Sequence, residues 1–181
     1  MISKAARRYA KALLQSAIEQ DILDDVEKDM QLILNTLKDS RKLSVFLKSP
    51  IIKKEDKQQV LSKIFDEHIS GETNSLLNLL SEKNRENMLG DICKGFIELF
   101  NQHKGIIQVA VTTAYEMNDS QRKDLHKVLV SSTGKKVEME VTVDTDIIGG
   151  VIVRIDDTVI DGSVKHKIRK LKNQFAVGTA V

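Results

Sequence analysis

The sequence predicts an α+β protein with an N-terminal six-helix bundle, residues 1–104, and a small C-terminal α/β domain, residues 105–181. The kind of apolar residue changes between the two parts. Residues 1–104 hold 15 Leu and 3 Val, whereas residues 105–181 hold 3 Leu and 13 Val. Leu loses little rotamer freedom in a helix, while the stiff side chain of Val favours strands. Gly105 is suited to end the last helix of the bundle, which places the boundary beside it.

Apolar residues at helical spacing define the helices of the first domain. The first is expected from Ser3 to about Gln20, and its apolar stripe is rich in small residues. The second follows Asp21, and a short third helix is stopped by Pro50, because a residue before proline avoids helical angles. The fourth covers about Lys54 to His68, the fifth follows Gly71, and the sixth ends near Gly105. Residues expected to face the interior of these helices include Ala6, Ala10, Leu13, Ala17, Ile22, Val26, Met30, Ile33, Leu37, Leu43, Phe46, Leu47, Val60, Leu61, Ile64, Phe65, Ile92, Phe96, Leu99 and Phe100.

Strand and helix patterns alternate in the second domain. The clearest strand is Lys136 to Asp144, where apolar and polar residues alternate strictly. A first strand covers Ile106 to Tyr115, and a third covers Ile147 to Ile155, interrupted by two glycines of the kind that mark a bulge or a close backbone contact. Asn118 or Ser120 caps a helix that ends at Gly134, and Val159 and Ile160 form a short strand. The expected inward residues are Ile107, Val109, Val111, Thr113 and Tyr115; Leu125, Val128 and Leu129; Val137, Met139, Val141 and Val143; and, on a basic last helix, Val164, Ile168, Leu171 and Phe175.

Composition excludes several classes of protein. A single cysteine, Cys93, cannot form an internal disulfide, and the longest apolar run, 147–153, is far shorter than the ~18 residues of a membrane span. No signal peptide is expected, so the default location is the reducing cytosol or a compartment facing it. The 28 Lys and Arg against 26 Asp and Glu give a net charge of only +2, which is weak support for nucleic-acid binding.

We find no pattern typical of catalysis, a metal centre or a cofactor. The four histidines are scattered, and Cys93 reads as a small core residue. The segment Thr133–Lys136 lacks the first glycine and the hydroxyl residue of a phosphate loop. The acidic pairs at 144/146 and 156/157 are interpreted as solvated turn residues. We therefore expect no catalytic residue, no metal and no cofactor.

Protein binding is the class of function that remains. The Ala-rich face of the first helix and the leucines of the fifth could together form a groove for a partner helix, although the same spacing is typical of ordinary core packing. The basic last helix favours packing on its own domain or on a partner. Binding of nucleic acid, which salt-dependent affinity would reveal, and an enzyme with an unfamiliar site are the alternatives.

Three stretches of the chain resemble one known family, the delta subunit of F-type ATP synthase, the bacterial relative of the mitochondrial oligomycin-sensitivity-conferring protein. They are the opening residues 6–13, the stretch from Val141 to Arg154 that contains Gly149 and Gly150, and Asp161-Gly162-Ser163-Val164 before the basic helix. Arg8 stands where many members have proline, and His166 where glycine is common. The order of these stretches, the length and the two-part layout agree with the family.

The resemblance implies a non-catalytic stator subunit that links the catalytic head to the peripheral stalk and so resists the torque of the rotor. It implies that the first domain receives the N-terminal helix of an alpha subunit between its first and fifth helices. The second domain would contact the b-subunit stalk. The complex would lie on the cytoplasmic face of the energy-coupling membrane, with no direct membrane insertion by this subunit. The implied groove residues are Ala6, Tyr9, Ala10, Leu13, Leu76, Leu79 and Leu80, and the structural signature is Gly149, Gly150, Asp161, Gly162 and Ser163. An Ala10→Trp substitution is then expected to block the groove without unfolding the domain.

Overall fold

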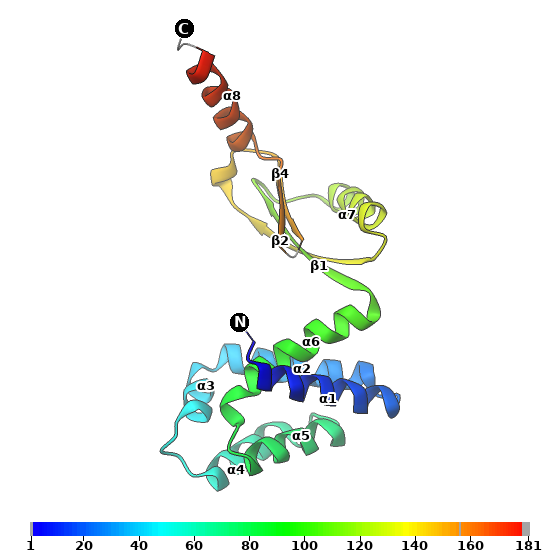
Figure 1. Cartoon of the computed structure of the whole chain (residues 1–181), viewed down its shortest axis with the longest axis vertical. Coiled ribbons are helices and arrows are strands. Elements are labelled where there is room, and N and C mark those ends of the chain that lie inside the picture. The colour runs from blue at the N-terminus through cyan, green and yellow to red at the C-terminus, as the bar shows by residue number, and fades with distance from the viewer. Residues whose placement is uncertain (1, 156, 179–181) are drawn as a thin grey trace. The chain divides into compact units, whose positions relative to one another are not determined.

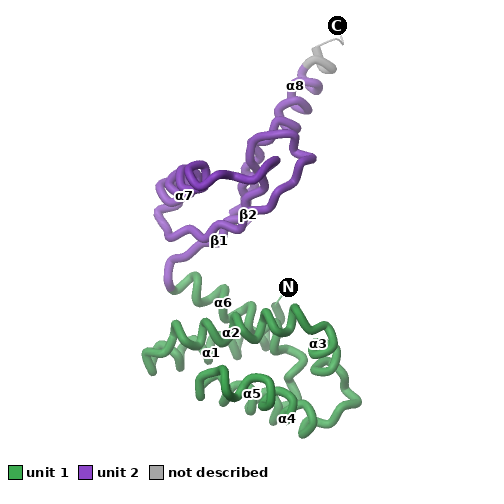
Figure 2. Tube along the Cα trace, turned by 180° about the vertical axis from the view of Figure 1, so that it is seen from behind, with its two compact units in different colours: residues 1–103 green, residues 104–181 purple. Residues whose placement is uncertain are grey.

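A computed structural model describes residues 2–155 and 157–178, except for the side chains of residues 175–178. The chain forms two compact units, residues 1–103 and 104–181 (Figure 2). The first contains helices, and the second contains a four-stranded mixed sheet with helices. The predicted α+β class is therefore confirmed.

The first unit is built from helices (Figure 1). Each of its α-helices buries one apolar stripe. Ser3 caps the first helix by accepting a hydrogen bond from the backbone N–H of Ala6 at 3.1 Å, as expected for a serine just before a helix. The fourth helix ends at Phe65, three residues before the predicted end. The helices are α1 (Lys4–Glu19), α2 (Leu23–Asp39), α3 (Arg41–Lys48), α4 (Lys54–Phe65), α5 (Gly71–Glu82) and α6 (Leu89–Lys104), with a 3-10 helix η1 (Glu86–Met88) before α6.

A polar network inside the first unit fixes the start of α5. Asp29 of α2 is 7% exposed, and its carboxylate accepts hydrogen bonds from the backbone N–H and the hydroxyl of Ser70, at 2.8 and 2.6 Å. Ser70 in turn caps α5 by accepting from the N–H of Thr73. A buried carboxylate needs such partners, because an unpaired one would lose its hydration without compensation. The start of α5 is thus tied to α2.

The sheet of the second unit has the strand order β2-β1-β3-β4. β1 pairs with β2 in parallel, with α7 as the connection between them, and the other pairs are antiparallel. The alternating segment predicted as the clearest strand is confirmed as β2. The elements are β1 (Ile106–Thr113), α7 (Asp119–Thr133), β2 (Lys136–Val143), a 3-10 helix η2 (Thr145–Ile147), β3 (Val151–Ile155), β4 (Thr158–Asp161) and α8 (Val164–Gly178).

The core of the second unit lies between α7 and one face of the sheet. Its buried members are Val109, Val111, Leu129, Val137 and Val153. Three residues predicted to face inward, on α7 or near the ends of β1 and β2, are exposed instead. Val128 on α7, Val143 at the end of β2 and Tyr115 beyond β1 are 58%, 46% and 73% exposed. Val143 and Tyr115 lie at or beyond the end of a strand, outside the core between α7 and the sheet, and Val128 lies on the exposed side of α7.

The ends of α7 follow the predicted chemistry. Asn118 accepts from the N–H of Gln121, and the Gln121 side chain accepts from the N–H of Asn118, which forms a complete capping box. Gly134 ends the helix in the left-handed conformation, with φ at +64°. His126 on α7 lies 3.1 Å from the carbonyl oxygen of Val137 on the edge strand β2. This contact gives a hydrogen-bond partner to one backbone carbonyl of the edge strand.

The third strand begins later than the sequence predicts. Residues 145–147 form the 3-10 helix η2, and β3 starts only at Val151. Ile148 and Gly150 have positive φ angles of +68° and +81°, which are incompatible with an extended strand. The two glycines are therefore part of a tight turn that precedes the strand.

Candidate partner-binding surfaces

The small-residue face of α1 lies inside the first unit. Ala6 and Ala10 have no exposed surface, and Leu13 is 5% exposed. A Cβ built on Gly95 of α6 would lie 3.4 Å from the Cβ of Ala10, so the two helices approach closely at this point. The alanines allow this approach because they carry little side chain. Three of the residues predicted to line a groove thus pack against their own domain.

The leucines predicted on α5 divide between the interior and the surface. Leu76 and Leu80 are 7% and 1% exposed, whereas Leu79 is 40% exposed. Leu79 also lines a surface pocket between α4 and α5 together with Gln58 and Asn78, which are joined by a 3.0 Å hydrogen bond. Among the seven residues predicted to line the groove, Leu79 has the largest exposed fraction.

Polar contacts join α1 and α5 along their outer edge. The Ser16 hydroxyl donates to Glu72 Oε1 at 2.5 Å, and Gln20 Nε2 donates to Glu72 Oε2 at 3.1 Å. Just past the other end of α5, Arg85 Nη1 donates to the Tyr9 hydroxyl at 3.0 Å. The end of α1 therefore meets the start of α5, and the two helices run antiparallel. The half-buried Tyr9 lies at this seam, which has the Arg85 contact at one end and the Glu72 contacts at the other.

Arg85 and Glu72 were not identified by the sequence patterns. Arg85 also places its guanidinium 5.8 Å from the centre of the Tyr9 ring, within the range of a cation–π contact. Both residues bridge segments more than fifty positions apart, and a single sequence carries no local signal for such a pair. Their contacts hold the seam between α1 and α5 in one geometry.

The signature residues of the second unit form a backbone clasp between the turn before β3 and the start of α8. The N–H of Gly162 donates to the Val151 carbonyl, and the N–H of Val164 donates to the Gly149 carbonyl, both at 2.9 Å. A Cβ on Gly150 would lie 2.5 Å from the carbonyl oxygen of Gly162. Such a distance leaves no room for a side chain. Backbone proximity therefore requires glycine at position 150, whereas a Cβ on Gly149 would meet the side chain of Val164 at 3.2 Å.

Asp161 and Ser163 complete the clasp with side-chain hydrogen bonds. Asp161 Oδ1 accepts from the N–H of Ser163 at 2.9 Å, and Ser163 Oγ accepts from the N–H of His166 at 3.1 Å, which caps α8. The hydrogen bonds from Ser163 hold the pKa of the Asp161 carboxyl below its usual value, and the nearby His166 and Arg169 add to this effect. His166 Nδ1 lies 3.5 Å from Asp161 Oδ2.

The helix that follows the clasp presents an exposed apolar stripe. Val164, Ile168 and Leu171 stand at positions i, i+4 and i+7 and are 36%, 41% and 52% exposed. Phe175, predicted to continue this stripe, has a side chain outside the described part of the structure. Within the second unit, Figure 1 shows α8 leading away from the strands. The stripe that was predicted to face inward is therefore exposed at these three residues, although Val164 lies next to Gly149.

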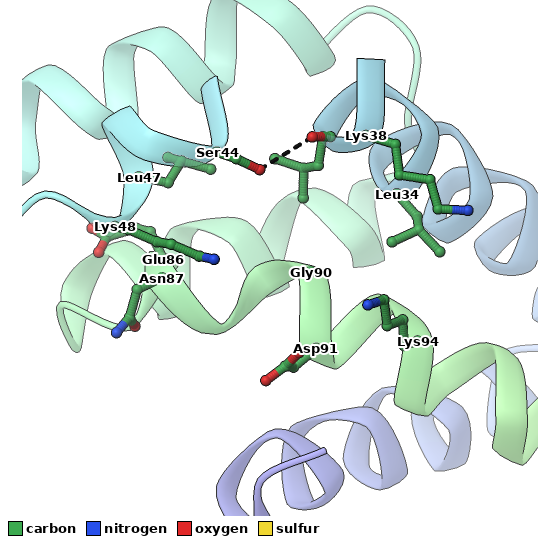
Figure 3. Close-up of a pocket in the computed structure, with 11 residues that line it drawn as sticks. Leu34, Lys38, Ser44, Leu47, Lys48, Glu86, Asn87, Gly90, Asp91 and Lys94 are labelled. Atoms are coloured by element: carbon green, nitrogen blue, oxygen red, sulfur yellow. Dashed lines mark hydrogen bonds between the residues drawn. The ribbon is translucent and has the colours of Figure 1, made fainter. Parts of the chain in front are cut away.

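The first unit also has a small pocket between α2, α3 and α6 (Figure 3). Its volume of about 200 Å³ is below the ~300–1,000 Å³ typical of small-molecule sites. Leu34, Leu37 and Leu47 line it, and the amines of Lys48 and Lys94 lie on either side of Gly90. This pocket has no arrangement of nucleophile and base.

Within the described residues, no group of three His, Cys, Asp or Glu side chains is placed to hold a metal ion. Cys93 is buried in the first unit, and burial raises the pKa of its thiol to about 12. A thiol with that pKa carries almost no thiolate at neutral pH, so it is a poor nucleophile. None of the described helices combines the length and the apolar character that are needed to cross a bilayer.

Comparison with known proteins gives consistent matches over nearly the whole chain. A family model described as "ATP synthase delta (OSCP) subunit" matches residues 5–175. The "ATP synthase subunit delta" of Chloroherpeton thalassium is 36% identical over 98% of this chain and 97% of the relative, and that of Chlorobium phaeovibrioides is 39% identical over 94% of each. A chain in the cryo-EM structure of the Toxoplasma gondii mitochondrial ATP synthase hexamer has the same fold. Its TM-score is 0.76 at 21% identity, with 96% of this chain and 98% of that chain covered.

Proposed function

The chain belongs to the ATP synthase delta (OSCP) subunit family, and we propose that its two units bind different partners, one in the catalytic head and one in the peripheral stalk. As a delta subunit it is a stator component of an F-type ATP synthase and interacts with other subunits of that complex. The observation that carries this conclusion is the family match over residues 5–175, which spans both units.

We assign the first unit, a bundle of six α-helices, to the head. Its partner is the amphipathic N-terminal helix of an alpha subunit, which lies along the seam between α1 and α5. Tyr9 and Leu79 supply partly exposed apolar surface there, while Ala6, Ala10 and Leu80 support the two helices from behind. The Ser16–Glu72 and Tyr9–Arg85 contacts keep the seam preformed. A preformed surface reduces the ordering cost of binding.

Leu79→Asp tests this assignment, because it places a charge in the proposed contact. Leu32 on α2 is also 40% exposed, so Leu32→Asp is a control of equal exposure on another helix. We expect Leu79→Asp to weaken binding of an alpha-subunit N-terminal peptide by about tenfold or more, as for a residue near the centre of an interface. Leu32→Asp should bind normally. Equal affinities of the two variants, measured by fluorescence anisotropy with circular dichroism as a folding check, would contradict the placement.

We assign the second unit to the stalk and propose that α8 contacts the end of the b subunit. Its exposed stripe of Val164, Ile168 and Leu171 suits a helical partner, because these residues have the i, i+4, i+7 spacing that is typical of helix–helix contacts. Ile168→Asp should weaken binding to a b-subunit fragment. Val128→Asp on the exposed side of α7 serves as the control in the same unit. The assignment fails if the two variants retain the same affinity for the fragment.

The proposed role needs no chemistry from this subunit. Rotation in the head does useful work only when an equal and opposite torque is held by the stator. The joint must therefore dissociate slowly, and buried apolar contact can supply this at about 25 cal/mol per Å² before ordering costs are subtracted. We propose accordingly that the subunit is not itself an enzyme and that it sits at the cytoplasmic face of the membrane that holds the complex.

A further inference from the structure

The last helix combines an exposed apolar stripe with a strong and uniform charge. Residues 164–178 contain five Lys or Arg and no Asp or Glu, while the whole chain has a net charge of only +2. The five positive charges of this helix therefore exceed the net charge of the whole chain. This combination distinguishes α8 from the other helices, whose buried stripes are covered within the first unit or by the sheet.

The charges are placed next to the stripe. At 100° per residue, Val164, Ile168 and Leu171 fall within a 60° sector. Lys167 lies 40° beyond one side of this sector, and Lys165 and Lys172 lie within 60° of the other side. Lysines in such positions can keep the amine in water while the stem covers apolar surface. Arg169 and Lys170 lie on the remaining faces of the helix.

We propose that α8 binds the surface of an anionic lipid bilayer when the subunit is free of its stalk partner. The apolar stripe would enter the boundary between headgroups and acyl chains, and the flanking lysines would contact the anionic headgroups. This activity goes beyond the proposed stator function, and it uses the same face of α8 that we assign to the b subunit, so it belongs to the subunit outside the complex.

Two observations favour a bilayer over the other anionic surfaces. Nucleic acid would use the lysines but has no use for an exposed stripe of Val, Ile and Leu. A second copy of this chain would bring five further cations against the five already there, which opposes self-association through α8. An anionic bilayer can bury the apolar stripe and also attract the positive charges of α8.

The chain contains no Trp, so a single introduced Trp reports on one position. Leu171→Trp places this probe on the stripe, and Val128→Trp places it on the exposed face of α7 as a control. We expect the emission of Leu171→Trp in the full-length subunit to shift to the blue with vesicles of phosphatidylcholine and phosphatidylglycerol. The shift should be absent with phosphatidylcholine alone and should be lost at about 0.5 M salt, where charges are screened. Val128→Trp should not respond.

A charge variant with a matched control tests the role of the lysines. In the Leu171→Trp background, replacing Lys165, Lys167 and Lys172 by Gln should weaken partitioning by roughly a hundredfold, or about fivefold for each cation. Replacing Lys38, Lys48 and Lys94 by Gln changes the net charge equally but should leave partitioning nearly unchanged. The proposal is overturned if both triple variants bind alike, if Val128→Trp shifts as much as Leu171→Trp, or if neutral vesicles give the same shift. It is also overturned if short duplex DNA, but not vesicles, shifts Leu171→Trp.

Discussion

Replacing Gly150 by Ala should open the clasp that holds the start of α8. The new Cβ would lie 2.5 Å from the carbonyl oxygen of Gly162 and 3.2 Å from the Cα of Ser163, and both of these are backbone atoms that cannot rotate away. Gly150 also has φ at +81°, where a residue with a Cβ is strained by about 1–2 kcal/mol. Overpacking against fixed atoms adds about 1–3 kcal/mol. The expected loss is therefore about 2–5 kcal/mol, a large part of the ~5–15 kcal/mol that stabilises a typical domain.

Gly134→Ala separates the two contributions to this loss. Gly134 has a similar φ of +64°, but a Cβ there meets nothing within 4 Å. It should lose only the conformational part, about 1–2 kcal/mol. The difference between the two variants then measures the close approach of the backbone, about 1–3 kcal/mol. In a unit of this size, that difference should lower the melting temperature by at least about 4 °C.

The assay combines urea denaturation with amide hydrogen exchange in the full-length subunit. Exchange resolves the second unit from the first, which a single denaturation curve does not. The N–H of Val164, bonded to the Gly149 carbonyl, should lose protection in Gly150→Ala and keep it in Gly134→Ala. If Gly150→Ala were no less stable than Gly134→Ala, or if the protection of Val164 were unchanged, the clasp would not be the anchor of α8.

Three further predictions concern buried or charged groups. Ala10→Trp should unfold the first unit rather than only block a groove, because Ala10 has no exposed surface and lies against Gly95; a native circular dichroism spectrum and melting curve would contradict this. Asp161→Asn should destabilise the second unit near pH 7 and lose this effect as the pH falls below the unfolded pKa of ~3.9 and through the lowered folded pKa. The pKa of Asp161 is lowered in the folded state, so the ionised carboxylate stabilises the fold above the unfolded pKa of ~3.9, and this stabilisation is lost as the pH falls through the folded pKa. Urea denaturation at several pH values measures the effect, and a destabilisation that stays constant with pH would refute the prediction. Cys93, with a pKa raised to about 12, should react with a thiol reagent at pH 8 only after unfolding, and rapid labelling of the native subunit would show that the site opens.

Local chemistry was predictable wherever one short segment decides the outcome. Ser3 and the capping box at Asn118 are side chains that bond their own backbone, and the alternation in Lys136–Val143 reflects the two-residue period of a strand. The change from Leu to Val likewise separated a helical unit from a unit that contains the sheet. These features depend on neighbours within a few positions, which a single sequence contains.

The candidate site was only partly predictable. Spacing identified the stripe that contains Ala6 and Ala10 but could not say whether α6 or a partner covers it, because a helical period gives a face and not its neighbour. The Tyr9–Arg85 contact joins positions 76 residues apart and leaves no mark in either segment.

The sequence by itself determined the class of the fold, the division into two units and the family, because composition, periodicity and residue order are properties of the chain. The tertiary structure decided which apolar residues remain exposed. Leu79 on α5 and the stripe on α8 are exposed because the packing of their own unit covers these faces only in part, while Leu80, one position further along the same helix as Leu79, is buried. It also gave Gly150 its physical reason, which is the approach of the Gly162 carbonyl oxygen to within 2.5 Å of where a side chain would begin.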